Sequence, residues 1–353
     1  MSAQAAAGRA LHTRGARIAG LVSALPAREI GNDVFDARFG AGPVRDVIKM
    51  IGVERRRWAS PGQSTGSLCL AAGKRLLAGL DWEPGSVDAV LFVSQTPEYR
   101  LPATAFVLQR DWGLPATCLA LDVNLGCSGY PQALWLGMNL IQSGAARRVL
   151  LAVGDTISKL IDPDDRSTSL LFGDACTVTA LEAGTPDDVA HFVIGSDGRG
   201  ATNLIVPSGA FGDYDTTADP RFAERSPRHL FMDGGEIFNF TLQGVPPLVA
   251  HTFAHAGREP GAYDAFLFHQ ANQFMLKHLA KKAGLPAAKV PSNIARYGNT
   301  SCASIPLLMT TDLRAELAVR PLELAMFGFG VGYSWASASL AVGPLRVIDT
   351  LDL

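Results

Sequence analysis

Among the side chains that can act as nucleophiles, Cys127 lies in the most informative setting. It follows a strand-like run and precedes an apolar helical run, within the motif Gly-Cys-Ser-Gly, so its sulfur would lie at a helix N-terminus. Backbone N–H groups and the helix dipole stabilise a thiolate there and lower the thiol pKa. A thiolate attacks carbonyl carbon, so this position would support covalent acyl transfer. Taken alone, it fits a small buried side chain better than a nucleophile.

His269 ends the apolar run 265–268 and is followed by Gln-Ala-Asn. Ligands of α/β proteins bind at the carboxyl ends of strands, so an imidazole at this place suggests a catalytic role. A core histidine that hydrogen-bonds the backbone would explain the same local pattern equally well.

Asn299 lies in Tyr-Gly-Asn-Thr-Ser, a loop of small residues before a helical segment that begins near residue 305. Its amide can donate hydrogen bonds into a cleft or cap that helix, and the local sequence favours the cap. The later run 327–333, Phe-Gly-Phe-Gly-Val-Gly-Tyr, can expose backbone N–H groups because glycine allows close approach. It lacks the strand and helix context of a dinucleotide-binding motif.

Strand-like and helical segments alternate along the chain, which predicts a layered α/β architecture with buried sheets. The strand-like runs are 17–24, 89–95, 118–125, 148–153, 176–181, 266–269 and 324–328. Apolar residues recur at helical spacing in 128–143, 235–256 and 273–284. These elements would have to position the three polar side chains.

An internal repeat relates the two parts of the chain. Residues 88–95 resemble 264–270, and residues 150–154 resemble 324–328. The motif around Cys127 lies at nearly the same offset from a second small-residue motif around Cys302. Three segments in one order, at a spacing of about 175 residues, indicate a duplicated half.

The repeat predicts two halves packed face to face around one site. We expect an N-terminal half over 17–184 that carries the cysteine and a C-terminal half over 185–353 that carries the histidine and the asparagine. The polar segment at about 197–232, rich in Gly, Pro, Asp and Arg, is expected to be an irregular insertion or cap. Residues 1–16 are expected to form a flexible tail.

Length and charge narrow the class of protein. A chain of 353 residues exceeds what one hydrophobic core usually holds, which agrees with two halves. Hydrophobic residues make up 48% and charged residues 18%, as in a compact globular protein. The formal net charge is −2 and no long Lys/Arg stripe occurs, so neither nucleic acid nor an anionic membrane is an expected partner.

The five cysteines are widely separated and include no Cys-x-x-Cys pair, so the sequence predicts neither a disulfide framework nor a metal site. Free thiols fit a reducing cytoplasm. The N-terminus lacks the apolar core of a signal peptide, and no run of about 18 apolar residues occurs. We expect a cytoplasmic protein without a metal or a bound cofactor.

Taken together and in this order, the motifs around Cys127, His269 and Asn299 and the final Gly-Phe-Gly-Val-Gly-Tyr-Ser-Trp resemble the β-ketoacyl-acyl-carrier-protein synthase III family of the thiolase superfamily. His-Gln-Ala-Asn followed by Gly-Asn-Thr-Ser is the most specific part, and the Asp-Pro-Asp-Asp-Arg motif that ends at Arg166 adds to it. The resemblance extends from about residue 17 to residue 342. It implies the thiolase fold, a duplicated αβαβα architecture, in a homodimer.

The resemblance also implies roles for individual residues. Cys127 would take an acyl group from an acyl-CoA thioester, and backbone N–H groups of Cys127 and Val331 would hold the oxyanion. His269 and Asn299 would donate hydrogen bonds to a malonyl-type thioester, whose loss of carbon dioxide leaves an enolate that attacks the acyl-cysteine. This role requires a neutral imidazole with a protonated Nε2.

Several positions depart from the family pattern. The implied coenzyme A site comprises Arg45, Lys49 and Arg166, and Arg45 stands where the family has an adenine-stacking tryptophan. Leu101 occupies the place of a gate that the partner subunit adds to the acyl pocket. Phe274 replaces a basic residue that would meet an acidic acyl carrier protein.

Asn239 likewise stands near a position where the family has a lysine. Because acidic carrier proteins dock through Lys and Arg, these changes weaken the implied carrier-protein surface. They favour a role in specialised metabolism over ordinary fatty-acid initiation.

Three alternatives remain open from the sequence. The same triad can pass the acyl group to an alcohol or an amine, as divergent members of the family do. A papain-like Cys-His-Asn hydrolase shares the residue types but has different surroundings of its cysteine. A non-catalytic partner subunit is the third, and the complete triad argues against it.

Overall fold

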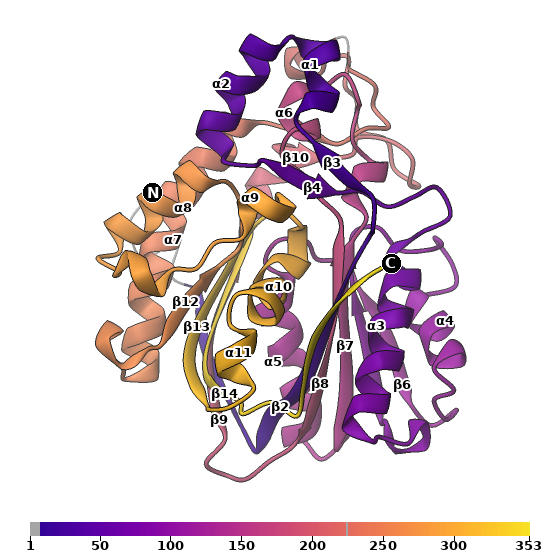
Figure 1. The fold of residues 1–353 in the computed structure, drawn as a ribbon, viewed down its shortest axis with the longest axis vertical. Coiled ribbons are helices and arrows are strands. Elements are labelled where there is room, and N and C mark those ends of the chain that lie inside the picture. Colours follow the sequence, from indigo (N-terminus) through magenta and orange to yellow (C-terminus); the bar gives the residue numbers. More distant parts are fainter. Residues whose placement is uncertain (1–7, 224) are drawn as a thin grey trace.

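Two β-sheets stand side by side in the computed structural model, with helices between them and on both outer faces (Figure 1). The structure describes residues 8–223 and 225–353. One outer layer consists of α3 (Thr65–Leu80) and α4 (Thr104–Asp111), the central layer of α5 (Gly129–Gln142) and α10 (Ser304–Thr311), and the other outer layer of α7 (Gly234–Ala256) and α8 (Gln273–Lys282). The layers are therefore αβαβα, and the predicted architecture is confirmed.

The six-stranded sheet has the order β15-β2-β8-β7-β5-β6. Its strands are β15 (Val347–Asp352), β2 (Ala16–Leu25), β8 (Ala175–Ala183), β7 (Arg148–Asp155), β5 (Ala89–Val93) and β6 (Leu119–Val123). Strands β7, β5 and β6 are parallel, and β8 is antiparallel to both β2 and β7. Every residue of β5 is buried, as expected for a parallel strand covered on both faces.

The five-stranded sheet has the order β1-β9-β14-β13-β12. Its strands are β1 (Arg9–Arg14), β9 (Val189–Ser196), β14 (Ser334–Val342), β13 (Leu322–Gly330) and β12 (Ala265–Phe268). The strands β9, β14, β13 and β12 match β2, β8, β7 and β5 in order and direction, with two antiparallel pairs followed by one parallel pair. This topology bears out the duplication read from the sequence.

The central helices hold the two sheets together through apolar side chains. Leu134 and Met138 of α5, and Leu308 and Met309 of α10, are fully buried between strands of both sheets. Burial of each such side chain stabilises the fold by about 1.5–3 kcal/mol. The sheets therefore form one rigid body, and the ends of their strands are fixed relative to one another.

A cap covers the end of the molecule at which β5, β7, β12 and β13 terminate, at the top of Figure 1. It consists of β3 (Glu29–Gly31), α1 (Asp33–Phe39), α2 (Ala41–Ile51), β4 (Arg55–Arg57), α6 (Arg166–Ser169) and the pair β10 (Leu204–Ile205) and β11 (Phe231–Met232). The buried guanidinium of Arg56 donates to the carbonyl of Leu170 and to Asn32 Oδ1, both at 2.7 Å, and so ties these parts together. The predicted polar segment 197–232 supplies β10 and β11.

The expectation of a flexible tail over residues 1–16 is wrong for its second half. Residues 9–14 form β1, which pairs antiparallel with β9 from Arg9 opposite Ile194 to Arg14 opposite Val189. The backbone hydrogen bonds of a sheet edge order this polar segment, and its sequence gives no apolar run to reveal it. Residues 1–7 of the predicted tail lie outside the described residues.

The remaining helices are α9 (Ile294–Tyr297) and α11 (Arg314–Leu317). In residues 8–223 and 225–353, no helix has the length and apolar character that crossing a membrane requires.

Candidate active site

Cys127 lies in the turn between β6 and α5, next to the residue that caps the helix. It is buried, and the end of β13 closes over it, since a Cβ added to Gly330 would lie 2.9 Å from Cys127 Sγ. The backbone N–H groups of Val331 and of Cys127 itself act to lower the pKa of this thiol. The helix start and the glycine-rich turn, which are far apart in the sequence, thus meet at one thiol.

The expected lowering of the Cys127 pKa is wrong in direction. Burial raises the pKa of Cys127 to about 12, and the nearby carboxylate of Asp155 adds to this effect. The backbone N–H groups and a hydrogen bond from Ser301 pull the pKa in the opposite direction without compensating. The resting thiol is therefore protonated at pH 7, and its attack on a carbonyl needs a proton acceptor.

His269 directly follows β12, where its backbone N–H donates to the carbonyl of Phe327 at 2.8 Å. The imidazole is buried, and its Nδ1 lies 2.8 Å from Ser304 Oγ. Burial lowers the pKa of His269 to about 4. The ring is therefore neutral at pH 7, the state that a hydrogen-bond donor to a thioester carbonyl requires.

Asn299 is anchored by its backbone to the loop that follows α6. Its N–H donates to Leu171 at 2.9 Å, and its carbonyl accepts from Gly173 at 3.0 Å. Its side-chain Oδ1 accepts from the backbone N–H of Ser301 at 3.0 Å, which fixes the amide plane. The alternative role as a helix cap is excluded, since α10 begins after Ala303 without any side-chain cap.

Cys127, His269 and Asn299 line one inner cavity of about 80 Å³. Its other lining residues are Leu171, Phe172, Leu204, Met232, Gly234, Ile237, Thr241, Ala271, Asn272, Met275, Phe329 and Gly330. The sequence therefore identified three side chains that the fold brings to one space.

A larger outer cavity of about 660 Å³ adjoins the inner one. Five residues line both cavities: Leu171, Met232, Gly234, Asn272 and Met275. The outer cavity is mainly apolar but is lined by Arg166, Arg225 and Asp165, and Arg225 Nη1 pairs with Asp165 Oδ2 at 3.0 Å. Two cations and one carboxylate therefore lie beside the space that adjoins the inner cavity.

The other predicted site residues occupy different places. Arg166 lines the outer cavity, whereas Arg45 and Lys49 lie on exposed positions of α2, a helix that reaches this cavity through Val47. Leu101 is 77% exposed in the loop before α4 and does not line either cavity of its own chain. Its predicted place in a partner's acyl pocket stays a prediction.

Sequence reasoning missed the residues that support the triad. Asp155 ends β7, is fully buried and accepts hydrogen bonds from Ser94 Oγ at 2.9 Å and from the backbone N–H of Gln95 at 2.7 Å. Ser301 donates its backbone N–H to Asn299 Oδ1 at 3.0 Å, and it contributes to the pKa shifts of Cys127 and His269. The only sequence signal for Asp155 was its position at the end of a buried apolar strand. Ser301 is revealed by tertiary contacts alone.

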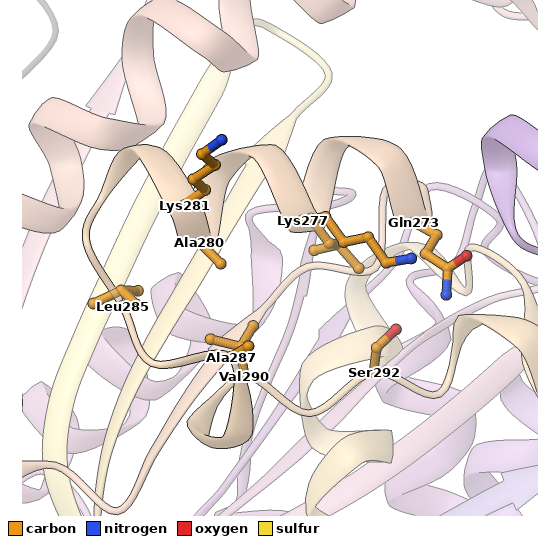
Figure 2. A pocket seen from close by; sticks show the side chains of 9 residues that line it. Gln273, Lys277, Ala280, Lys281, Leu285, Ala287, Val290 and Ser292 are labelled. Atoms are coloured by element: carbon orange, nitrogen blue, oxygen red, sulfur yellow. The ribbon is translucent and has the colours of Figure 1, made fainter.

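A separate groove of about 570 Å³ runs along α8 outside this site (Figure 2). Its lining is mainly apolar and includes Leu276 and Ala280 of α8. Val290, from the loop below the helix in Figure 2, also lines it. Lys277 and Lys281 line the groove and are exposed. This groove shares no lining residue with the inner cavity.

Within the described ranges, no three His, Cys, Asp or Glu side chains gather in a way that could hold a metal ion.

Comparison with known proteins identifies the family. The sequence model described as 3-oxoacyl-[acyl-carrier-protein (ACP)] synthase III matches residues 121–198, and the model of its C-terminal part matches residues 253–342. The first match contains Cys127, and the second contains His269 and Asn299. Together the two matches therefore include all three triad residues, whereas the lining residues between 204 and 241 lie outside both.

Relatives extend the similarity to nearly the whole chain. β-Ketoacyl-[acyl-carrier-protein] synthase III 2 of Streptomyces coelicolor is 35% identical over 333 residues, which cover 92% of this chain and 93% of the relative. The crystal structure of a 3-oxoacyl-(acyl-carrier protein) synthase from Burkholderia xenovorans LB400 has a TM-score of 0.97 and 69% identity, and the match covers 98% of this chain and 99% of that one.

A further solved relative is the priming β-ketosynthase from the R1128 polyketide biosynthetic pathway, with a TM-score of 0.81 and 26% identity, covering 94% of this chain and 97% of that one. The chain belongs to the 3-oxoacyl-[acyl-carrier-protein] synthase III family and is a condensing acyltransferase of the thiolase superfamily.

Proposed function

We propose that this enzyme takes an acyl group from an acyl-CoA onto Cys127 and condenses it with a malonyl-type thioester, with loss of carbon dioxide. The observation that carries the proposal is the inner cavity in which Cys127, His269 and Asn299 meet. A nucleophile and two hydrogen-bond donors around one small space are the parts that a decarboxylative condensation needs.

In the first half-reaction, Cys127 attacks the thioester carbonyl of the acyl-CoA. The negative charge that develops on the carbonyl oxygen is held by the backbone N–H groups of Cys127 and Val331, which already face the sulfur. Such preorganised donors typically contribute about 10²–10³ in rate for each hydrogen bond. Coenzyme A leaves, and the acyl group remains on Cys127.

In the second half-reaction, the carbonyl of a malonyl-type thioester accepts hydrogen bonds from His269 and Asn299. The Asn299 amide is oriented by its contact with Ser301, which engages Oδ1 and leaves Nδ2 as the donor. Loss of carbon dioxide then produces an enolate whose charge both donors stabilise. Its carbon attacks the acyl-cysteine, and one carbon–carbon bond forms.

The outer cavity suits the donor substrate. Its apolar walls suit the pantetheine chain, and Arg166 offers a cation to the phosphates of coenzyme A, as does Arg225, whose Nη1 also pairs with Asp165 at 3.0 Å. The inner cavity of about 80 Å³ beside the thiol is much smaller than the outer cavity of about 660 Å³, which favours a short acyl group. We therefore expect acetyl or propionyl donors to react faster than octanoyl donors.

We further propose that the enzyme acts as a homodimer in which Leu101 reaches the partner's acyl pocket. Strand β6 is the edge of its sheet, and its Leu119 and Leu121 are 42% and 45% exposed. Pairing of two such edges would cover these apolar side chains and remove an open sheet edge. Leu121→Arg should then convert a dimer into a monomer in sedimentation analysis.

An acyl carrier protein is the expected bearer of the malonyl group. Phe274 is 51% exposed where the family has a basic residue, so contact near the outer cavity would be apolar. Lys277 and Lys281 on the next turns of α8 are exposed cations that would meet an acidic carrier. This mixed surface and the likeness to a polyketide priming enzyme support specialised metabolism in the cytoplasm.

The experiment that tests the reaction follows two products. Wild-type enzyme is incubated with acetyl-CoA and a malonyl thioester, and carbon dioxide and the 3-oxoacyl product are both quantified. If the proposal is right, the two products form in equal amounts. Acyl transfer to an added alcohol or amine, without carbon dioxide release, would instead identify the non-condensing reaction. If none of the acyl-CoA thioesters tested gives a product, both the condensing and the non-condensing reaction are overturned.

A further inference from the structure

A chain of hydrogen bonds joins the start of α5 to the turn between β13 and β14. Gln132 Nε2 donates to Ser128 Oγ at 2.9 Å, and the hydroxyl oxygens of Ser128 and Ser334 lie 2.6 Å apart. Ser334 Oγ also donates to the carbonyl of Val331 at 2.7 Å. Both serines are buried. The chain therefore links the residue that follows Cys127 with the turn that contains Val331.

The direction of these hydrogen bonds follows from the donors that are present. The carbonyl of Val331 can only accept, so the single hydroxyl proton of Ser334 points to it. Ser334 must then accept from Ser128, and Ser128 in turn accepts from the amide of Gln132. Each hydroxyl thus has one donor and one acceptor as partners, and the chain is fixed in one direction.

Ser128 is the residue that precedes the first turn of α5. At such a position a serine side chain commonly accepts a hydrogen bond from a backbone N–H of the helix. The Ser128 side chain makes no such cap. Its hydroxyl proton is directed to Ser334 instead, across the space between the two sheets.

The turn at the end of this chain lies against Cys127. A Cβ added to Gly330 would lie 2.9 Å from Cys127 Sγ, and one added to Gly126 would lie 2.9 Å from Val331 Cγ1. Gly330 and Gly332, on either side of Val331, have positive φ angles of 157° and 136°. Because glycine restrains the backbone least, the orientation of the Val331 peptide groups depends on contacts from outside the turn.

We propose that the hydroxyl of Ser334, oriented by Ser128, positions the Val331 N–H for the oxyanion that forms when Cys127 attacks an acyl carbonyl. The inference rests on the acyl-cysteine chemistry proposed above. Ser334 does not line the inner cavity, so it is a positioning residue. It holds the carbonyl of Val331 and thereby restricts the rotation of the N–H of the same residue.

The consequence is a fixed spacing between the two oxyanion donors. The N–H of Cys127 belongs to the start of α5 and that of Val331 to the turn after β13, so the donors come from different halves of the chain. Ser128 and Ser334 join these two elements next to the donors. An oxyanion hole is effective because its donors are already in place when the charge develops.

Ser334→Val and Ser334→Thr form a matched pair, because valine and threonine have the same shape and differ by the hydroxyl. At saturating acetyl-CoA, intact-mass kinetics should show Cys127 of Ser334→Val acetylated about 10- to 100-fold more slowly than in wild type, since misplacement of a donor is costly. Ser334→Thr should react about as fast as wild type, because it keeps a hydroxyl donor. KM for acetyl-CoA should change little, since Ser334 lines neither cavity.

Alkylation of Cys127 by iodoacetamide separates the positioning of an oxyanion donor from a general loss of structure. Iodide is displaced from a saturated carbon, so this reaction forms no oxyanion. Ser334→Val should therefore be alkylated as fast as Ser334→Thr. Equal slowing of alkylation and acetylation in Ser334→Val, or equal acetylation of the two variants, would overturn the proposal.

A double-mutant cycle tests the role of Ser128. Ser128→Ala removes the donor to Ser334 and should slow acetylation by a smaller factor than Ser334→Val, because the hydrogen bond to Val331 remains. The double variant should react as slowly as Ser334→Val alone, since Ser128 acts through the Ser334 hydroxyl. Acetylation of Ser128→Ala at the wild-type rate, or losses that multiply in the double variant, would contradict the chain.

Ser337→Val is the matched control. Ser337 also lies on β14 and is fully buried, but its hydroxyl lies 2.6 Å from that of Thr252 on α7. Because residues three apart on a strand point to opposite faces, this pair is separated from the turn by the sheet. Acetylation of Ser337→Val should match wild type, and a loss equal to that of Ser334→Val would refute the positioning role. Thermal melts followed by circular dichroism compare the folding of all variants.

The activated ester p-nitrophenyl acetate distinguishes a failure of this inference from a failure of the proposed function. Attack of Cys127 on this ester also forms an oxyanion, but it requires no coenzyme A. If no acyl-CoA acetylates the wild type, the proposed function is refuted, and faster release of nitrophenolate by Ser334→Thr than by Ser334→Val still supports the positioning role. Equal release by the two variants would overturn that role.

Discussion

The backbone N–H of Ser301 donates to Oδ1 of Asn299 at 3.0 Å, and the side chain of Ser301 acts to lower the pKa of Cys127 against the larger effect of burial. One loop residue therefore orients the amide for which we propose a role in the second half-reaction and influences the thiol proposed for the first.

The triad should separate by half-reaction. His269→Ala and Asn299→Ala are each expected to reduce carbon dioxide release from a malonyl thioester by about 10²–10³-fold, because each removes one donor to the enolate. Acylation of Cys127 by acetyl-CoA should persist in both variants. Intact-mass kinetics and carbon dioxide measurement check the two halves separately, and equal loss of both would argue against the assigned roles.

Gly330 should tolerate no side chain. An added Cβ would lie 2.8 Å from Cys127 Cβ and 2.9 Å from its Sγ, so Gly330→Ala must displace the thiol. We expect acylation to fall by more than about tenfold, since small misplacement at a reacting centre is costly. Gly198→Ala is the control, because a Cβ there meets no atom within 4 Å. Similar acylation rates in the two variants would contradict the geometry.

The pH dependence of decarboxylation should reflect a buried, neutral imidazole. The pKa of His269 is lowered from 6.5 to about 4, so the His269 contribution to activity should fall only as pH drops through about 4. The unfolded state binds the proton near pH 6.5 and the folded state does not, so stability decreases as pH falls from 6.5 towards 4. Rate profiles and melts at each pH measure both effects. An activity loss centred near pH 6.5, absent from His269→Gln, would contradict this view.

The cations of the outer cavity should control binding of the donor more than the chemical step. Arg225→Ala and Arg166→Ala are expected to raise KM for acetyl-CoA about tenfold, the equivalent of about 1.4 kcal/mol, with little change in kcat. Arg45→Ala is the comparison variant, because the sequence assigned Arg45 to the coenzyme A site although this residue does not line the outer cavity. A larger KM effect for Arg45→Ala than for Arg225→Ala would restore the assignment made from the family pattern.

The sequence predicted the elements that are apolar throughout. Strand β5 and helix α7 were both recognised, the latter despite Pro246 and Pro247 within it, because buried runs and helical spacing are local signals. Strand β1 was missed because its residues are mostly polar and its order comes from pairing with β9. A local pattern of apolar residues therefore reveals buried segments. The formation of an edge strand depends on pairing with a strand far away in the chain, which no local pattern shows.

The same distinction applies to the site. Cys127, His269 and Asn299 stood in recognisable motifs, but the direction of the Cys127 pKa shift was wrong, because burial and the charge of Asp155 outweigh the helix start. Arg225 could not be found because the polar segment that carries it shows no motif, and only folding brings it to the outer cavity.

The most direct measurement is the intact mass of the enzyme after brief incubation with acetyl-CoA. Wild-type enzyme and Cys302→Ala should each gain one acetyl group, located on the peptide that contains Cys127, and should lose it when a malonyl thioester is added. Cys302 is the matched control because it is a free, buried thiol, 1% exposed against 8% for Cys127. Cys127→Ala should gain none. An acetyl group that accumulates on Cys127→Ala, or one that persists on the wild type in the presence of the malonyl thioester, would contradict the account.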